Sequence, residues 1–81
     1  MTETPTLWAQ WGENVRQRRK ARDWSQHKLA IEAKLVVTTI SDIERGMSGG
    51  SDQTKIKIAQ ALGVEVHDLF AYPPLTEAAA S

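Results

Sequence analysis

The stretch WSQHKLAIEAKLVVTTISDIERG, residues Trp24–Gly46, decides the fold of this chain. Apolar residues recur at helical spacing in two short runs, first between Leu29 and Ala33 and then between Ile40 and Ile43. The residues between these runs break the period, which predicts two short helices separated by a tight turn. Such a pair buries little apolar surface alone, so other helices must support it. The second helix presents small side chains to solvent, a shape that fits the major groove of DNA.

Two residues mark the ends of this helix pair. Ser25 is a predicted N-cap, because its hydroxyl oxygen can accept a hydrogen bond from an amide of the first turn. Gly46 follows the second helix, where a glycine commonly ends a helix.

The composition excludes several classes of function. A chain of 81 residues makes one small domain, with no room for a deep catalytic pocket beside a core. It contains no cysteine, which excludes a disulfide framework and a thiolate metal site. The histidines, His27 and His67, have no acidic or histidine partner at ligand spacing, so no metal or other cofactor is predicted. No membrane span or signal-peptide pattern is present, so we expect a cytoplasmic protein.

Charge is unevenly distributed, although the chain carries ten basic and ten acidic residues. Residues 14–34 hold seven basic and two acidic residues, a balance of +5, whereas residues 51–81 hold two basic and four acidic residues, a balance of −2. A neutral protein with this asymmetry can present a positive face to phosphates. The alternative is an ordinary solvated helix surface.

A long helix is predicted ahead of the central pair, over residues 7–22. Its apolar side chains recur at spacings of three and four as far as Val15, and the next position on the same side is Arg19. A guanidinium that faces a core requires a partner to neutralise it.

Two more helices are predicted after the pair, over residues 52–62 and 66–71, and two prolines end the second. The first of them is expected to offer four apolar residues to the core: Ile56, Ile58, Ala59 and Leu62. The predicted fold class is all-α, a compact five-helix domain over residues 7–71. A flexible N-terminus at residues 1–6 and a proline-containing C-terminal tail at residues 72–81 are expected to flank it.

Three motifs stand in register without a gap: SQxxLA at residues 25–30, IxxIERG at residues 40–46 and AxALGVxxxxLF at residues 59–70. In order and spacing they resemble the lambda-repressor-like (XRE-type) helix-turn-helix domains, which include phage repressors, Cro proteins and restriction-controller proteins. The match covers about residues 11–70. The resemblance implies a DNA-binding transcription regulator without enzymatic activity, located at the nucleoid, with the helix-turn-helix at its second and third helices.

The resemblance also implies which residues meet DNA. The N-terminal part of the third helix, residues 37–45, would enter the major groove. The positions that match base-reading residues are Val36, Val37, Thr38 and Asp42. The residues expected to contact phosphate are Ser25, Gln26, Thr39 and Arg45, with Arg16 from the basic first helix. Because no arginine or glutamine stands at a base-reading position, readout should be apolar and partly through DNA shape.

A structural pair is implied as well. Arg19 and Glu44 match a salt bridge that commonly joins the first helix to the end of the third, which supplies the partner required above. Three positions depart from the family pattern. Lys34 stands where the turn usually has glycine, Val36 stands at the usual polar cap, and the loop of residues 47–51 carries no lysine.

We therefore expect a Cro-like or controller-like regulator that binds a two-fold operator in double-stranded DNA as a homodimer and takes no small-molecule substrate. The residues expected at the dimer interface are Phe70, Tyr72, Pro73 and Leu75, and the alternative contact is through exposed tryptophans of the first helix. The alternative is a protein-interaction module of the same fold, an antitoxin or anti-repressor. This alternative predicts an exposed apolar patch, for example one formed by the tryptophans.

Overall fold

The computed structural model describes residues 6–72 of the chain. They form five helices: α1 (Thr6–Ala21), α2 (Gln26–Ala33), α3 (Val37–Glu44), α4 (Asp52–Leu62) and α5 (Val66–Leu69). The described residues contain no strand. The predicted all-α, five-helix fold with a helix-turn-helix at α2 and α3 is therefore confirmed.

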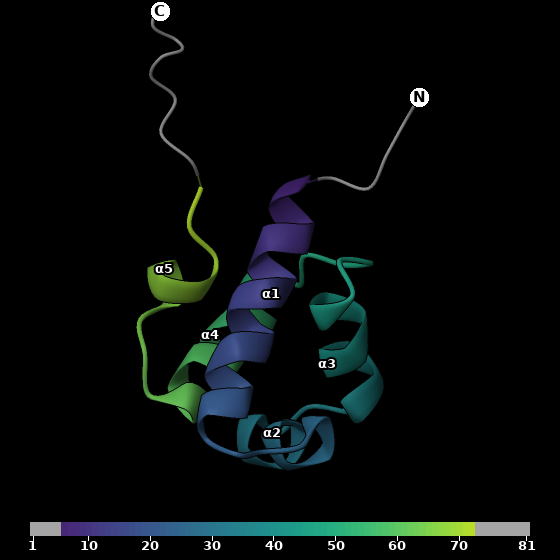
Figure 1. The fold of residues 1–81 in the computed structure, drawn as a ribbon, viewed down its shortest axis with the longest axis vertical. Coiled ribbons are helices and arrows are strands. Elements are labelled where there is room, and N and C mark those ends of the chain that lie inside the picture. The colour runs from purple at the N-terminus through teal and green to yellow at the C-terminus, as the bar shows by residue number, and fades with distance from the viewer. Residues whose placement is uncertain (1–5, 73–81) are drawn as a thin grey trace, which may run out of the picture.

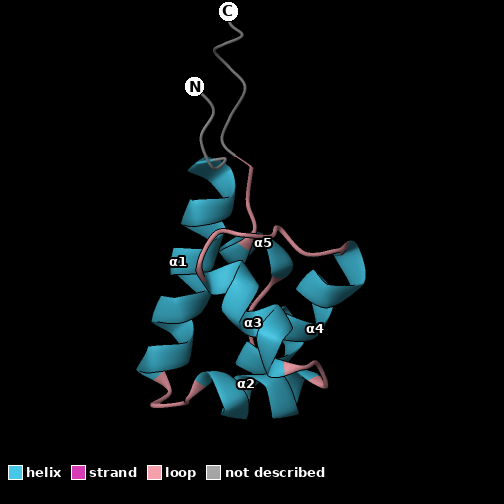
Figure 2. Cartoon of the chain, turned by 90° about the vertical axis from the view of Figure 1, so that its right-hand side faces the viewer, coloured by secondary structure: helices cyan, strands magenta, loops and turns pink. Residues whose placement is uncertain are grey.

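The long helix α1 packs mainly against α3 and α5. Figure 1 shows α3 on one side of α1, α4 and α5 on the other, and α2 across one end of the molecule. The view at right angles in Figure 2 again places α2 across that end, with the first turn of α1 and the residues after α5 at the opposite end. α2 contacts both α3 and α4, so the helix-turn-helix is held by the rest of the domain.

The chain ends fall largely outside the described residues. Of the expected flexible N-terminus, residues 1–6, only Thr6 is described, and of the expected tail, residues 72–81, only Tyr72 is described. The division of the chain at these two points stays a prediction. The predicted helix over residues 66–71 is shorter than expected, because α5 ends at Leu69 and Phe70 is its C-cap.

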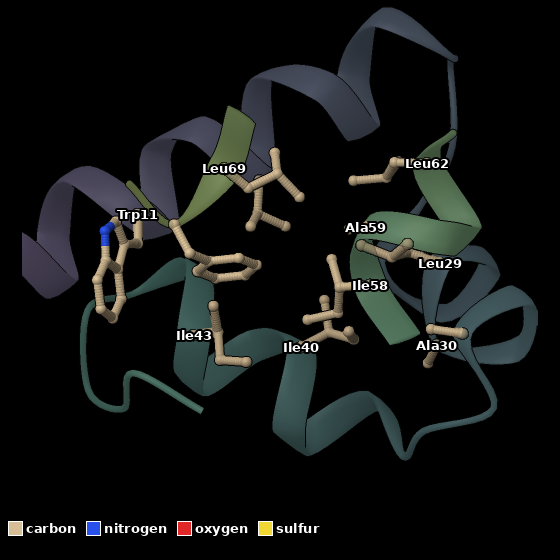
Figure 3. Close-up of a cluster of buried hydrophobic side chains, with 12 residues drawn as sticks. Trp11, Leu29, Ala30, Ile40, Ile43, Ile58, Ala59, Leu62 and Leu69 are labelled. Atoms are coloured by element: carbon tan, nitrogen blue, oxygen red, sulfur yellow. The ribbon is translucent and has the colours of Figure 1, made fainter. Parts of the chain in front are cut away.

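The core draws on every helix, and Figure 3 shows its side chains pointing into one space between them. The buried apolar residues are Trp11, Val15, Leu29, Ala30, Ala33, Ile40, Ile43, Ile58, Ala59, Leu62, Leu69 and Phe70. The prediction that Ile56 faces the core is wrong, since its side chain is exposed. Ile56 and the buried Ile58 are separated by about 200° around the helix, so one helix cannot bury both against a single core.

Local signals set the ends of α2 and α3. The Ser25 hydroxyl accepts a hydrogen bond from the Lys28 amide over 3.0 Å, as predicted for an N-cap. Val36 occupies the N-cap of α3 and makes no side-chain cap bond, yet α3 begins at Val37 as expected. Lys34 ends α2 with φ of 61° and ψ of 45°, the left-handed conformation that favours glycine. A side chain with a Cβ is disfavoured in this conformation, so the turn carries strain at Lys34.

A buried glycine lets α1 and α3 approach closely. A Cβ at Gly12 would lie 2.7 Å from the carbonyl oxygen of Glu44 and closer still to that of Ile43. These two carbonyls belong to the last turn of α3, so any side chain at Gly12 would push α3 away from α1. The glycine therefore helps to fix the position of α3, the predicted recognition helix.

Candidate nucleic-acid interface

The predicted recognition helix α3 is anchored in the core by its buried side chains and carries exposed side chains at its N-terminal end. Ile40 and Ile43 are fully buried in the core. At the start of the helix, Val36 at the N-cap and Val37 and Thr38 in the first turn are exposed. The first turn of α3 therefore presents two branched apolar side chains and a hydroxyl from a rigid support. Methyl groups suit the thymine C5-methyl group, and a hydroxyl can pair with several base edges.

The other two residues predicted on this helix lie less openly. Asp42 and Thr39 are each partly buried. Thr39 stands beside the exposed first turn, and its amide donates to the carbonyl of Val36 over 3.1 Å. The predicted roles of base reading at Asp42 and phosphate contact at Thr39 stay predictions.

A buried ion pair joins α1 to the C-terminal end of α3. Arg19 donates from Nε to Glu44 Oε2 over 2.7 Å and from Nη2 to Glu44 Oε1 over 2.9 Å. The two side chains are 10% and 3% exposed. Arg19 also donates from Nη1 to the carbonyl oxygen of Trp24 over 2.8 Å, at the start of the helix-turn-helix. This is the pairing that the resemblance implied, and it ties three segments together.

The same carboxylate orients a residue that is predicted to contact phosphate. Gln26 Nε2 donates to Glu44 Oε1 over 3.0 Å, which fixes the side-chain amide at the first position of α2. The hydrogen bonds with Glu44 raise the pKa of Arg19 above its ordinary value, burial opposes this, and the charge of Glu44 reinforces it. Arg19 is therefore a permanent cation, and Glu44 holds both side chains in place.

Basic residues surround this network at the surface. A shallow depression of about 380 Å³ is lined by Arg16, Arg19, Lys20, Gln26, Glu44 and Arg45. It lies beside the N-terminus of α2, where the free amides and the helix dipole favour an anion. Ser25 is exposed at the same helix end. The structure thus brings most of the predicted phosphate-contacting residues to one place.

Two other basic residues of this region are engaged elsewhere. Arg22 donates to the carbonyl oxygen of Leu62 over 3.0 Å and lies 4.9 Å from the centre of the Trp24 ring, so it closes the end of α4. Lys28 pairs with Glu32 across one turn of α2 at 2.9 Å. Part of the positive charge predicted for the surface therefore has a structural role.

The loop between α3 and α4 is held by a tryptophan, which the sequence pattern did not reveal. A Cβ at Gly49 would lie 2.6 Å from Trp8 Nε1, so the indole of α1 packs directly on the loop backbone. Gly50 has φ of +79°, and its amide donates to the Ser48 hydroxyl over 3.1 Å. The sequence shows a glycine at position 49 and a tryptophan at position 8, but only the folded chain shows that they are in contact.

The residues expected at a dimer interface divide into three groups. Phe70 is 3% exposed and belongs to the core of its own chain, which corrects the expectation that its ring contacts a partner. Tyr72 is 69% exposed and packs edge-on against Trp11, with ring centres 5.3 Å apart. Pro73 and Leu75 lie outside the described residues.

Two further findings concern residues 6–72 only. Among these residues, no group of three or more acidic or histidine side chains is placed to hold a metal ion. None of the described helices has the length and apolarity that a membrane crossing requires.

Comparison with known proteins places these features in context. A helix-turn-helix family profile (HTH_3) matches residues 15–69. The chain is 46% identical over 63 residues to the control protein C.BamHI of Bacillus amyloliquefaciens, and the match covers 76% of this chain and 78% of that protein.

Solved structures agree with the sequence comparison. The restriction-modification controller protein C.AhdI of Aeromonas hydrophila superposes with a TM-score of 0.75 at 32% identity, covering 78% of this chain and 96% of that one. The hypothetical transcription factor NHTF from Neisseria superposes with a TM-score of 0.77 at 32% identity, covering 91% of this chain and 84% of that one.

Proposed function

The chain belongs to the HTH_3 family of helix-turn-helix proteins and is a DNA-binding transcription regulator, and we propose that it binds a two-fold operator as a homodimer with α3 in the major groove. The exposed first turn of α3 carries this proposal. Val36, Val37 and Thr38 are exposed at the N-terminal end of a helix that Ile40 and Ile43 anchor in the core, so the reading surface is held rigidly. The depression at the N-terminus of α2 lies on the same helix pair and supplies charge for the flanking phosphates.

Base reading and phosphate contact fall to different residues in this proposal. Val36, Val37 and Thr38 read thymine methyl groups and neighbouring base edges, and Asp42 accepts a hydrogen bond from a cytosine amino group. The residues proposed to contact phosphate are Ser25, Gln26, Thr39, Arg45 and Arg16. Gln26 supports this division, because Glu44 already fixes its amide group and little side-chain freedom remains to be lost on binding.

The similarity to control proteins suggests a narrower role. C.BamHI is named as a control protein and C.AhdI as a controller of restriction-modification. We propose that this chain regulates genes in the same way, at the nucleoid in the cytoplasm, and that it catalyses no reaction. Its dimer contact would lie near Tyr72, which is exposed beside the end of α5, and would extend into Pro73 and Leu75.

A protein-interaction module of the same fold makes a different prediction. It requires a large exposed apolar patch, and the tryptophans were the obvious source. Trp11 is buried, and Trp8 and Trp24 are partly buried against the core. None of the three is available as an open patch, so the DNA-binding role is favoured.

A selection from random duplex DNA with the purified full chain tests the proposal, at the physiological salt concentration of about 150 mM. We expect enrichment of a two-fold palindrome whose half-sites are about one helical turn apart. Thr38→Ala should enrich a site that is relaxed at one base step. Ile31→Ala, an exposed change on α2 outside the proposed interface, is the matched control and should enrich the wild-type site. Enrichment of no sequence would refute the proposal and favour a protein partner.

A further inference from the structure

The recognition helix carries an ion pair at its C-terminal end, on the side that is proposed to face DNA. Arg45 Nη2 and Asp42 Oδ1 are 3.1 Å apart, one helical turn from each other. The side chains are 64% and 39% exposed, so water reaches both. An exposed pair of this kind is weak, and another partner can replace either member at little cost.

Asp42 is the accessible acid of α3. The only other acid of the helix, Glu44, is held by Arg19 and Gln26 and is 3% exposed. A carboxylate beside DNA phosphates is repelled unless a donor sits against it. In the free protein Arg45 is that donor.

Arg45 has a second possible position. It lines the same depression as Arg16, Lys20 and Gln26, where a phosphate would be bound. The ion pair rests on the single contact between Arg45 Nη2 and Asp42 Oδ1, so turning the planar guanidinium toward a phosphate in the depression weakens its hold on Asp42. Contact of Arg45 with phosphate and contact of Asp42 with a base are therefore linked through this ion pair.

We propose that Asp42 determines specificity by acting through Arg45, an inference that rests on the proposed function. On a wrong sequence Asp42 finds no base donor and retains Arg45, so that one phosphate contact is withheld. On the right sequence an exposed amino group in the major groove, such as cytosine N4, replaces Arg45 at the carboxylate. Arg45 is then released to a phosphate, so the two contacts form together.

The proposal predicts opposite effects on specific and non-specific DNA. Asp42→Asn removes the charge that retains Arg45, so each protomer of the dimer neutralises one more phosphate on an unrelated sequence. Two such contacts steepen the salt dependence of log K by about 1.8 and raise affinity about 30-fold near 150 mM salt. We therefore expect about 30-fold tighter binding to an unrelated duplex. Binding to the selected duplex should gain nothing or weaken, so the ratio between the two falls at least about 30-fold.

Arg45→Gln provides the complementary variant. It should weaken binding of the dimer to the selected duplex about 30-fold, through one lost phosphate contact in each protomer, and should also weaken binding to the unrelated duplex, because Asp42 is left there without its donor. The double variant Asp42→Asn/Arg45→Gln should lose the non-specific gain. Glu32→Gln is the charge-matched control, because it removes the same charge from an exposed pair with Lys28 on α2. It should change both affinities by the same factor.

The experiment is fluorescence anisotropy of full-length wild type and variants on the selected and unrelated duplexes, as a function of salt, with circular dichroism to verify folding. Equal tightening of Asp42→Asn on both duplexes would overturn the inference, since general repulsion alone would then explain Asp42. An unchanged affinity for the unrelated duplex would also overturn it. If wild type discriminated between no duplexes at all, the proposed function itself would fail, and this result is distinct from the other two.

Discussion

Removal of the Arg19 guanidinium should destabilise the whole domain. Arg19→Ala deletes three hydrogen bonds, two to Glu44 and one to the carbonyl oxygen of Trp24. The Glu44 side chain is 3% exposed and would keep Gln26 as its remaining side-chain donor. Breaking a buried pair in this way typically costs about 3–5 kcal/mol, a large part of the total stability of a small domain.

This loss of stability is large enough to measure by thermal melting. At about 4–8 °C per kcal/mol for a domain of this size, Arg19→Ala should lower the melting temperature by about 12 °C or more. Thermal and urea unfolding followed by circular dichroism measure the loss. Lys28→Ala is the control, because it breaks an exposed pair with Glu32 and should cost less than about 1 kcal/mol.

Two further results test the reasoning behind this number. Arg19→Met/Glu44→Met removes both charges and should be more stable than Arg19→Met alone, because no uncompensated carboxylate stays buried.

Hydrogen bonding to Glu44 raises the pKa of Arg19, so its stabilisation is complete below its ordinary pKa and is lost only as pH rises through the raised value. Titration of Arg19 should therefore contribute nothing to the pH dependence of stability between about pH 6 and pH 9. A loss under about 1 kcal/mol in Arg19→Ala would show that the pair is not a buried anchor.

The remaining predictions concern the helix crossing, the turn and the reading surface. Gly12→Ala should destabilise the domain by the upper end of about 1–3 kcal/mol, since the new Cβ meets the last carbonyls of α3; a higher melting temperature would contradict this packing. Lys34→Gly should stabilise by about 0.5–1 kcal/mol in urea unfolding, because it relieves a left-handed residue, and a loss of stability would exclude strain there. Thr38→Ala should cost about 1–3 kcal/mol on the selected duplex in anisotropy titrations, whereas an equal loss on every duplex would exclude base contact.

The fold followed from sequence because several local signals agreed. Apolar spacing placed the five helices, and Ser25 marked the start of α2 through a hydrogen bond of its own side chain. Arg19 lies on an otherwise apolar side of its helix, which indicated that it needs an acidic partner. That this partner is Glu44 was implied by the family resemblance and not by the spacing. Periodicity shows which side chains share a face, but not which other element meets that face.

The errors have the same origin. Ile56 is apolar and near the core-facing positions of α4, but its direction around the helix leaves it exposed. Phe70 follows α5 at the end of the domain and was assigned to a partner, yet it folds back against Trp11, with ring centres 5.6 Å apart. The proximity of the chain end to α1 determines this burial, and no local pattern encodes it.

The close approaches between distant segments were also not predictable. Gly12 stands in the middle of a predicted helix, where glycine is unfavourable on local grounds, and only the structure shows that α3 is the neighbour that requires it. The contact of Trp8 with Gly49 likewise depends on how α1 lies across the loop after α3. Both contacts position the recognition helix, so a part of the site geometry emerges only from tertiary packing.

The most direct test of the central claim is dimethyl sulfate protection on the selected duplex with the wild-type chain. Guanine N7 lies in the major groove and adenine N3 in the minor groove, so one reagent reports on both. With α3 of each protomer in the major groove, we expect protection of N7 in two blocks whose centres are about 10 base pairs apart. Protection confined to adenine N3, or to one block, would contradict a dimer that reads DNA through α3.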